Sequence, residues 1–225
     1  MEFAKFGSMM HRLASARAGI TRADLAFLES LFPSESQAIQ RLWTDPEAVT
    51  SILDSKEIHR SLLESPVALP VSASLYFYVL VRHAFLDGGI EHPDLADYVA
   101  GVLVEKLDQR PDPRSGAMPA WVTHAVDFVS AIQSTHGMLR FHLEVAAGNQ
   151  FLILTGMFPE FIEHRAERHG APGREFYESF GRQAYRRASG QTGIDGSARE
   201  LLGLLSETFP LAISSLNRMH DRCLF

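Results

Sequence analysis

The hydrophobic residues of this chain recur three and four positions apart along most of its length, which is the period of a helix rather than of a strand. The stretch 119–135 shows the pattern clearly. Its apolar side chains fall on one side of a helix: Val122, Ala125, Val126, Val129 and Ile132. Start and stop signals separate such stretches throughout, so the pattern predicts an all-α protein, a bundle of about ten helices with no substantial sheet.

Capping signals mark the helices of the N-terminal half. Thr21, with Asp24 three residues later, has the spacing of a capping box and predicts a helix through Phe32. The stretch 74–86 carries residues of high strand propensity, but it is apolar on all sides and ends at a glycine pair with no partner strand in view, so we predict a helix. Further helices are expected over 34–43, 46–53, 56–63 and 93–107.

The C-terminal half is expected to hold the centre of the bundle. The stretch 139–155 is apolar nearly all round and predicts a buried central helix, followed by helices over 159–169 and 174–189. Pro210 is expected to bend or break the last helix before residue 211. We predict one domain over 1–225, in which 108–118 form a long Pro/Gly-rich loop and 190–197 a Gly-rich linker to the C-terminal helices.

Composition narrows the class of protein. Hydrophobic residues make up 46% of the 225 positions and charged residues 21%, which is typical of a folded globular chain. The net charge of -6 argues against general nucleic-acid binding, which needs many cationic contacts to phosphates. Cys223 is the only cysteine, so the chain has no intramolecular disulfide, and a reducing cytoplasm is the expected compartment.

Neither a secretion signal nor a membrane span is predicted. The first residues lack an apolar run of signal-peptide length followed by a cleavage site of small residues. The longest uncharged stretch, 65–81, contains two prolines and is shorter than the roughly 20 apolar residues that cross a bilayer. Both observations agree with a cytoplasmic location.

A stripe of Glu and His residues after Pro159 is a candidate metal site. Glu160, Glu163, His164 and Glu167 share one side of the predicted helix, and such side chains can ligate a metal. The Glu-x-x-His spacing of di-iron bundles and the His-Glu-x-x-His of zinc proteases do not occur in the chain. Because the opposite face is apolar, we expect the stripe to face solvent, and we predict no cofactor unless the metal alternative holds.

Polar residues in the central helix are the other candidate site. His142 and Asn149 lie seven positions apart on one side of an apolar segment, with Gln150 beside them. Buried polar groups must be paired, so these residues form either a structural hydrogen-bond network or the floor of a small ligand pocket. Glu144 is expected to pair with Arg140, four positions earlier.

Four more residues complete the candidate ligand set. His83 lies in a strongly apolar helix, where a core histidine with satisfied hydrogen bonds is expected more often than a ligand. Tyr177 and Tyr185 either line a cavity or simply pack. Arg182 belongs to the one concentration of cations, which offers an anion site, although Glu178 is well placed to pair with it at i, i+4.

Four segments of the chain carry a resemblance to a known group of proteins. They read LYFYVLVRHAF, FLILTGMFPEFIEHR, FYESFGRQAYRRAS and LNRMHDRCLF. They resemble stretches of an uncharacterised all-helical family found in bacteria. The resemblance implies a single helical domain and a prokaryotic source, and it brings no activity, cofactor or site residue with it.

The sequence favours a non-enzymatic binding or regulatory protein that uses an interhelical pocket or a helical surface, with a small molecule or another protein as partner. It contains no Gly-x-Ser-x-Gly and no phosphate-binding glycine-rich loop. One alternative is a metal-dependent enzyme that gathers His83, His142, Glu160, Glu163 and His164 between helices. The other is a self-associating structural protein, a homodimer held by the wide apolar faces of several helices.

Overall fold

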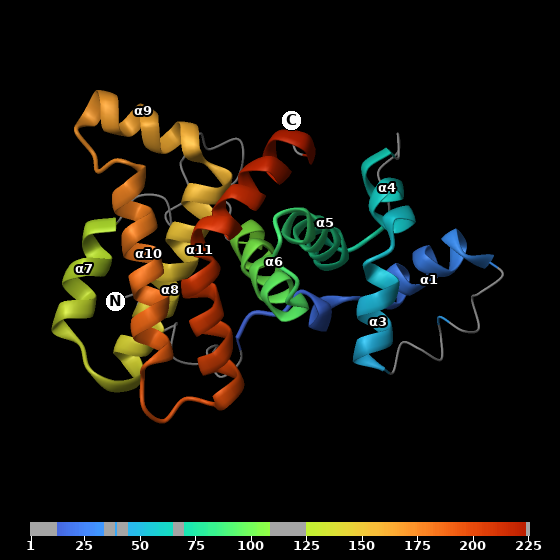
Figure 1. Ribbon diagram of the computed structural model, residues 1–225, viewed down its shortest axis with the longest axis horizontal. Helices are drawn as coiled ribbons and strands as arrows, with labels where there is room; N and C mark the ends of the chain where they lie inside the picture. Colours follow the sequence, from blue (N-terminus) through green and yellow to red (C-terminus); the bar gives the residue numbers. More distant parts are fainter. Residues whose placement is uncertain (1–12, 34–38, 40–44, 65–69, 109–124, 224–225) are drawn as a thin grey trace.

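The fold is all-helical, as the sequence predicts. The computed structural model describes residues 13–33, 39, 45–64, 70–108 and 125–223, and these form ten α-helices, one short 3-10 helix and no strand. The helices, labelled in Figure 1, are α1 (Arg22–Leu31), α3 (Pro46–Leu53), α4 (Lys56–Glu64), α5 (Ala73–Asp87), α6 (Pro93–Asp108), α7 (Ala125–Ser134), α8 (Gly137–Met157), α9 (Pro159–His169), α10 (Arg174–Ser189) and α11 (Gly196–Cys223), with the 3-10 helix η2 at Arg17–Gly19.

Helices α8, α10 and α11 pack side by side and form one end of the molecule, with α7 and α9 on their outer side (Figure 1). Small residues allow this close approach. A Cβ added to Gly148 would lie 2.6 Å from the ring of Tyr185, and one added to Gly181 would lie 2.6 Å from Phe209. The central helix is therefore α8, as the sequence predicts for 139–155.

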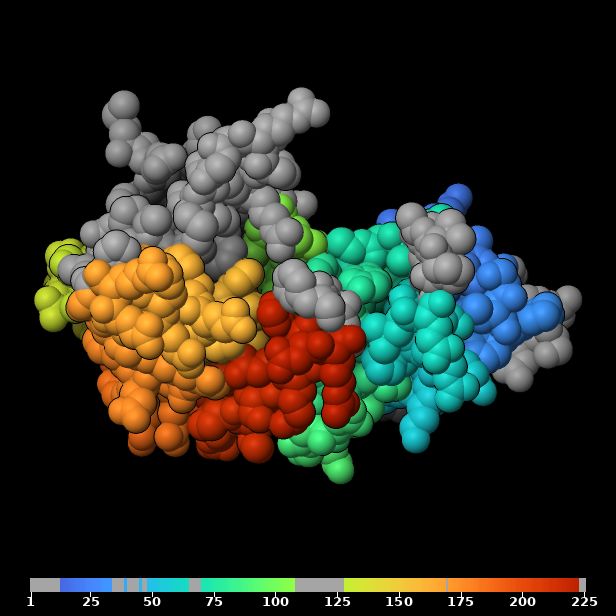
Figure 2. Space-filling view, turned by 90° about the horizontal axis from the view of Figure 1, so that it is seen from above, coloured from blue at the N-terminus to red at the C-terminus, as the bar shows by residue number. Residues whose placement is uncertain are grey.

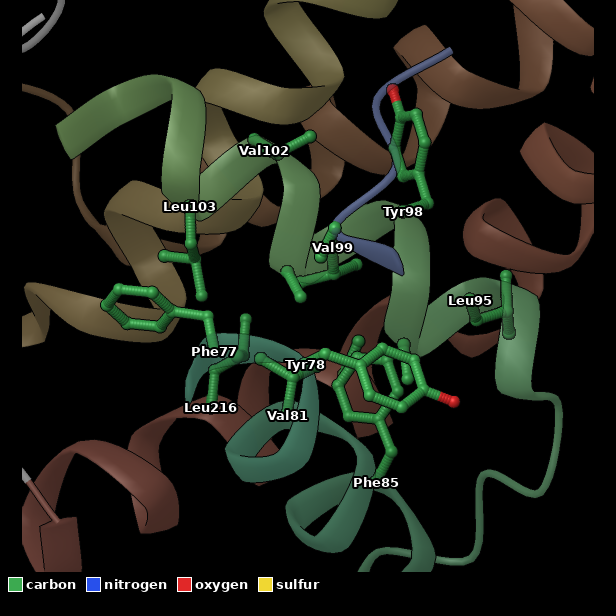
Figure 3. Packing of buried hydrophobic residues seen from close by; sticks show 14 of the residues in the cluster. Phe77, Tyr78, Val81, Phe85, Leu95, Tyr98, Val99, Val102, Leu103 and Leu216 are labelled. Carbon is green, nitrogen blue, oxygen red and sulfur yellow. The ribbon is translucent and has the colours of Figure 1, made fainter. Parts of the chain in front are cut away.

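Helices α5 and α6 form the middle layer. Figure 3 shows Phe77, Val81 and Phe85 of α5 facing Leu95 and Val99 of α6. Burial of such side chains stabilises the fold by roughly 1.5–3 kcal/mol each, which explains why the high strand propensity of this stretch does not decide its structure. The predicted helix over 74–86 is confirmed.

Helices α1, α3 and α4 lie on the far side of α5 from α8 and α10 (Figure 1). The capping box predicted at Thr21 and Asp24 is present at the start of α1. The carboxylate of Asp24 also accepts a 2.6 Å hydrogen bond from the backbone N–H of Ser72, the N-cap of α5. One buried acid thus joins the first turns of two helices.

In the space-filling view of Figure 2, α11 adjoins α4 and α5 and separates them from α8 and α9.

The last helix contains Pro210, at which we expected a bend or a break. Of these two outcomes the break is wrong, because α11 continues through Pro210 as one helix. Phe209, Ala212 and Ile213 are all buried against the bundle, and this packing offsets the loss of one backbone hydrogen bond. Two predicted segments lie outside the described residues. They are the helix 34–43, except for Ile39, and the loop 108–118, except for Asp108.

Candidate functional site

A polar cluster lies where α6, α8 and α10 meet. The side-chain oxygen of Asn149 on α8 accepts a 2.6 Å hydrogen bond from the hydroxyl of Tyr98 on α6 and a 2.7 Å bond from the hydroxyl of Tyr185 on α10. Both tyrosines are buried, with exposed fractions of 2% and 0%. Figure 3 shows the hydroxyl of Tyr98 pointing away from the side chains of α5. We call Tyr98, Asn149 and Tyr185, with Lys106 and Gln150 beside them, the polar junction.

The polar junction orients the amide of Asn149. Because two hydroxyls donate to the amide oxygen, its NH₂ group points away from both tyrosines. The side chain is half-buried, and this NH₂ group makes no hydrogen bond to any residue that the structure describes. Asn149 therefore presents two fixed donors at the edge of the junction.

The two tyrosines remain donors over the physiological pH range. Burial raises the pKa of Tyr98, although its hydrogen bond with Asn149 acts in the opposite direction. Burial also raises the pKa of Tyr185, and the neighbouring Tyr98 adds to the effect. Neither hydroxyl ionises near neutral pH, so the orientation of the amide does not depend on pH.

A half-buried cation lies beside Gln150 of the junction. The amine of Lys106 on α6 lies 3.5 Å from the side-chain oxygen of Gln150, which is itself buried. Burial lowers the pKa of Lys106, and the charge of Glu105 partly opposes this change. The amide of Asn149 and the amine of Lys106 are both suited to bind hydrogen-bond acceptors.

Glu144, one to two turns before Asn149 on α8, belongs to a separate ion cluster. Its carboxylate is buried, with 2% of the side chain exposed, and accepts 3.1 Å hydrogen bonds from Arg140 and from Arg187 of α10. The predicted pair with Arg140 is confirmed. The contact of Arg187 joins α8 to α10, so this cluster has a structural role.

The other residues of the predicted ligand set do not converge on the polar junction. His142 is half-buried and its ring meets the edge of Phe141 at 5.3 Å. Tyr177 packs among aromatic rings, with the centroid of Phe151 5.4 Å away. Arg182 is exposed on α10.

The predicted pairing of Glu178 is wrong. Its carboxylate accepts a 2.5 Å hydrogen bond from Arg174, one turn earlier on α10, and not from Arg182. Arg174 also donates a 3.0 Å hydrogen bond to the side-chain oxygen of Asn217 on α11, and this bond holds its guanidinium close to Glu178. Arginines lie four positions before and four positions after Glu178, and helix spacing alone favours the later one. The contact of Arg174 with α11 accounts for the pair that forms instead.

His83 is buried, as expected of a core histidine, but its hydrogen bonds are not all satisfied. Its Nε2 is one of two buried side-chain atoms that find no hydrogen-bond partner among the described residues, the other being the hydroxyl of Tyr78. Its ring stacks on that of His59 of α4, with centroids 4.2 Å apart and 12° between the planes. The expectation of a satisfied histidine is therefore wrong, because the ring packs on another imidazole instead of binding through Nε2.

The Glu/His stripe of α9 is on the surface. Glu160, Glu163, His164 and Glu167 are exposed, and Ile162 on the opposite face is buried, as the amphipathic pattern predicts. Within the described ranges, no group of three or more His, Cys, Asp or Glu residues is arranged to hold a metal ion. The structure thus does not join the stripe to His83 or His142.

Sequence reasoning missed Tyr98 and Lys106. Both lie on α6 among apolar residues, on a helix that the sequence marks only as amphipathic. Their spacing of eight residues places them on one side of that helix, and this was the available signal. The sequence has no signal for the contact of Tyr98 with Asn149, 51 residues away, or for that of Lys106 with Gln150.

Comparisons with known proteins give no relative. No family model, no curated protein and no solved structure matches the chain. Among the helices that the structure describes, none has the length and apolar character needed to cross a membrane. The function must therefore be argued from the residues themselves.

Proposed function

We propose that this protein is a non-enzymatic binding or regulatory protein of the bacterial cytoplasm, whose ligand is a small molecule that offers hydrogen-bond acceptors, such as a carboxylate or carbonyl, to the polar junction. The observation that carries the proposal is the amide of Asn149, which two buried tyrosines hold in one orientation with its donors directed away from them. The amine of Lys106 lies 3.5 Å from the side-chain oxygen of Gln150, the residue after Asn149 on α8.

Preorganisation is the physical reason to read this arrangement as a binding site. A donor whose orientation is already fixed loses little entropy when an acceptor binds, so its hydrogen bond contributes more to affinity. Interhelical sites of this kind combine apolar walls with a few fixed polar groups. The non-enzymatic part of the proposal rests on the sequence, which lacks the nucleophile and phosphate-binding motifs named above.

Thermal denaturation with a panel of small carboxylates and amides tests the proposal. A ligand at about 100 times its Kd should raise the Tm of the wild type by roughly 5 °C or more. Asn149→Leu should abolish this rise, whereas Gln183→Ala, an exposed change on α10, should leave it intact. A native mass spectrum of protein purified without added ligand should also show a bound small molecule.

Two outcomes would overturn the proposal. One is a panel without any binder together with a native mass spectrum that shows only the mass of the chain. The other is a ligand whose Tm shift is the same in the wild type and in Asn149→Leu, because it would bind elsewhere.

Self-association is the second candidate function, and one observation favours it. Met138 and Leu139 are adjacent on the first turn of α8 and remain 46% and 54% exposed, which is a high exposure for two consecutive large apolar side chains. A homodimer or another protein partner would cover them. Light scattering should then give twice the chain mass, reduced to one chain by Leu139→Lys but not by Leu211→Lys, which alters another exposed leucine. A single-chain mass at every concentration would exclude the homodimer.

A further inference from the structure

The contact between α4 and α5 is built on a pair of histidines. The rings of His59 on α4 and His83 on α5 stack almost in parallel, with centroids 4.2 Å apart. Ile58 and Leu62 of α4 are buried in the core, while the rest of α4 is mostly half-buried or exposed. The stack therefore acts together with two apolar side chains to attach this nine-residue helix to the middle layer.

The carboxylates around the stack already have arginines beside them. Asp54, just before α4, faces His83, but both of its oxygens accept 2.8 Å hydrogen bonds from Arg82. Asp87, at the end of α5, faces both histidines, but it is largely exposed and lies 3.7 Å from Arg222 of α11. Each carboxylate near the stack thus already has a cation beside it.

A protonated His83 would also lack a hydrogen-bond acceptor. Its ring interacts with the backbone of Ser55 in the loop before α4, which favours the proton on that side. Its Nε2 is buried and has no partner in the part of the chain that the structure describes. An imidazolium must donate through both nitrogens, so the second proton would be buried without an acceptor.

The titration of both rings agrees with this geometry. Burial lowers the pKa of His83, and the charge of His59 lowers it further, against the opposing effect of Asp54 and Asp87. Burial lowers the pKa of His59 as well, opposed by Asp87. A histidine whose pKa is lowered by folding stabilises the closed contact above its ordinary pKa of about 6.5, and this stabilisation is lost as the pH falls toward the lowered value.

We propose that His59 and His83 form a pH-sensitive latch that holds α4 against α5 at neutral pH and releases it in mildly acidic solution. Protonation places a cation in the stack, where a second imidazole and a buried nitrogen without an acceptor both oppose it, and the nearby aspartates already have arginines beside them. Release of α4 exposes Ile58 and Leu62, while α8, α10 and α11 keep their packing. The latch does not depend on the ligand proposed for the polar junction.

Hydrogen exchange measured by mass spectrometry tests the latch. Protection factors, corrected for intrinsic exchange, are compared at pH 7.5 and 5.5 for peptides covering 56–64 and, as an internal reference, 150–157 of α8. Protection of 56–64 in the wild type should fall by up to about tenfold for each histidine, because pH 5.5 lies about one unit below the ordinary histidine pKa of about 6.5. The reference peptide should not change.

Matched variants show whether the fall comes from the stack. Phenylalanine keeps an aromatic ring but cannot be protonated, so protection of 56–64 should become independent of pH in the double variant His59→Phe/His83→Phe. His92→Phe alters an exposed histidine before α6 and should keep the wild-type fall. If the double variant does not fold, His59→Phe at a half-buried position decides the question, because its fall should be smaller than that of the wild type when only His83 can still be protonated.

Three results would overturn the proposal. Protection of 56–64 in the wild type that does not depend on pH would exclude release of α4. A fall in His59→Phe as large as that of the wild type, or one that persists in the double variant, would assign it to other groups. An NMR titration in which the ring signals of His59 and His83 both have midpoints at or above 6.5 would show that the closed contact does not oppose protonation.

Discussion

Arg187 of α10 donates a 3.1 Å hydrogen bond to the carboxylate of Glu144, a buried residue on α8 that lies 43 positions earlier in the chain. The same oxygen accepts from Arg140. The acid is thus neutralised by one arginine of its own helix and by one of the facing helix, which ties the two most extensively packed helices together.

Loss of the Arg187 contact should destabilise the fold. Arg187→Ala leaves Glu144 with Arg140 alone, and we expect the free energy of unfolding in urea to fall by about 1–3 kcal/mol, less than for a fully buried pair because the guanidinium is partly exposed. Arg186→Ala removes the neighbouring exposed arginine and should change it by less than about 0.5 kcal/mol. Equal losses in the two variants would contradict a specific role for Arg187.

The hydrogen bonds of the polar junction should be strongly non-additive. Tyr98→Phe removes one bond to Asn149 and should cost about 1 kcal/mol. Asn149→Ala leaves the hydroxyls of Tyr98 and Tyr185 buried without their acceptor and should cost about 2–4 kcal/mol. In the background Tyr98→Phe/Tyr185→Phe, the cost of Asn149→Ala should be smaller, which urea unfolding of the double-mutant cycle measures. An unchanged cost would show that the tyrosines and Asn149 act independently.

Two glycines should respond in opposite directions to the same substitution. A Cβ at Gly148 would meet the ring of Tyr185 at 2.6 Å, so Gly148→Ala should lower the free energy of unfolding by about 1–3 kcal/mol. A Cβ at Gly203 on α11 meets nothing within 4 Å, so Gly203→Ala should raise it by about 0.5–1 kcal/mol through helix propensity. Thermal or urea unfolding of the pair checks both signs, and a stabilising Gly148→Ala would refute the close approach of α8 and α10.

Asp24 should make the fold sensitive to acid. Burial would raise the pKa of Asp24, but hydrogen bonds from Ser72 and Thr21 outweigh it and lower the pKa below its ordinary value. The resulting stabilisation is present above about pH 3.9 and is lost as the pH falls through the lowered pKa. Asp24→Asn should therefore cost about 1–3 kcal/mol at pH 7 and at pH 5, and this difference from the wild type should shrink below about pH 4. A difference that stays constant at pH 3 would mean that the charge is not involved.

The sequence predicted well those features that depend on neighbouring positions. The capping box at Thr21 and Asp24, the helix over 74–86 and the pair of Arg140 with Glu144 all depend on spacings of three or four residues, which a helix converts directly into contacts. The exposed stripe beginning at Glu160 follows from the same periodicity. Local rules failed at Glu178, whose partner is Arg174 and not Arg182, and in the expected break at Pro210, where distant packing supports a continuous helix.

The candidate site was predictable only in part. Asn149 stood out as a polar residue in an apolar helix, which is a property of sequence alone. The hydroxyls that orient its amide come from Tyr98 and Tyr185 on two other helices. A hydrophobic pattern does not specify which helices pack together or which of their residues come into contact. The stack of His59 on His83 likewise joins two residues whose neighbouring sequences do not predict that they are in contact.

By itself, then, the sequence determined the all-helical class, the positions of most helices and the faces that they bury, because helix periodicity and capping act over a few residues. The tertiary structure alone decided which polar groups share a site. The partners of Asn149, His83 and Glu144 are fixed by how helices dock, and docking depends on steric fits such as that of Tyr185 against Gly148, which arise only when distant segments come together.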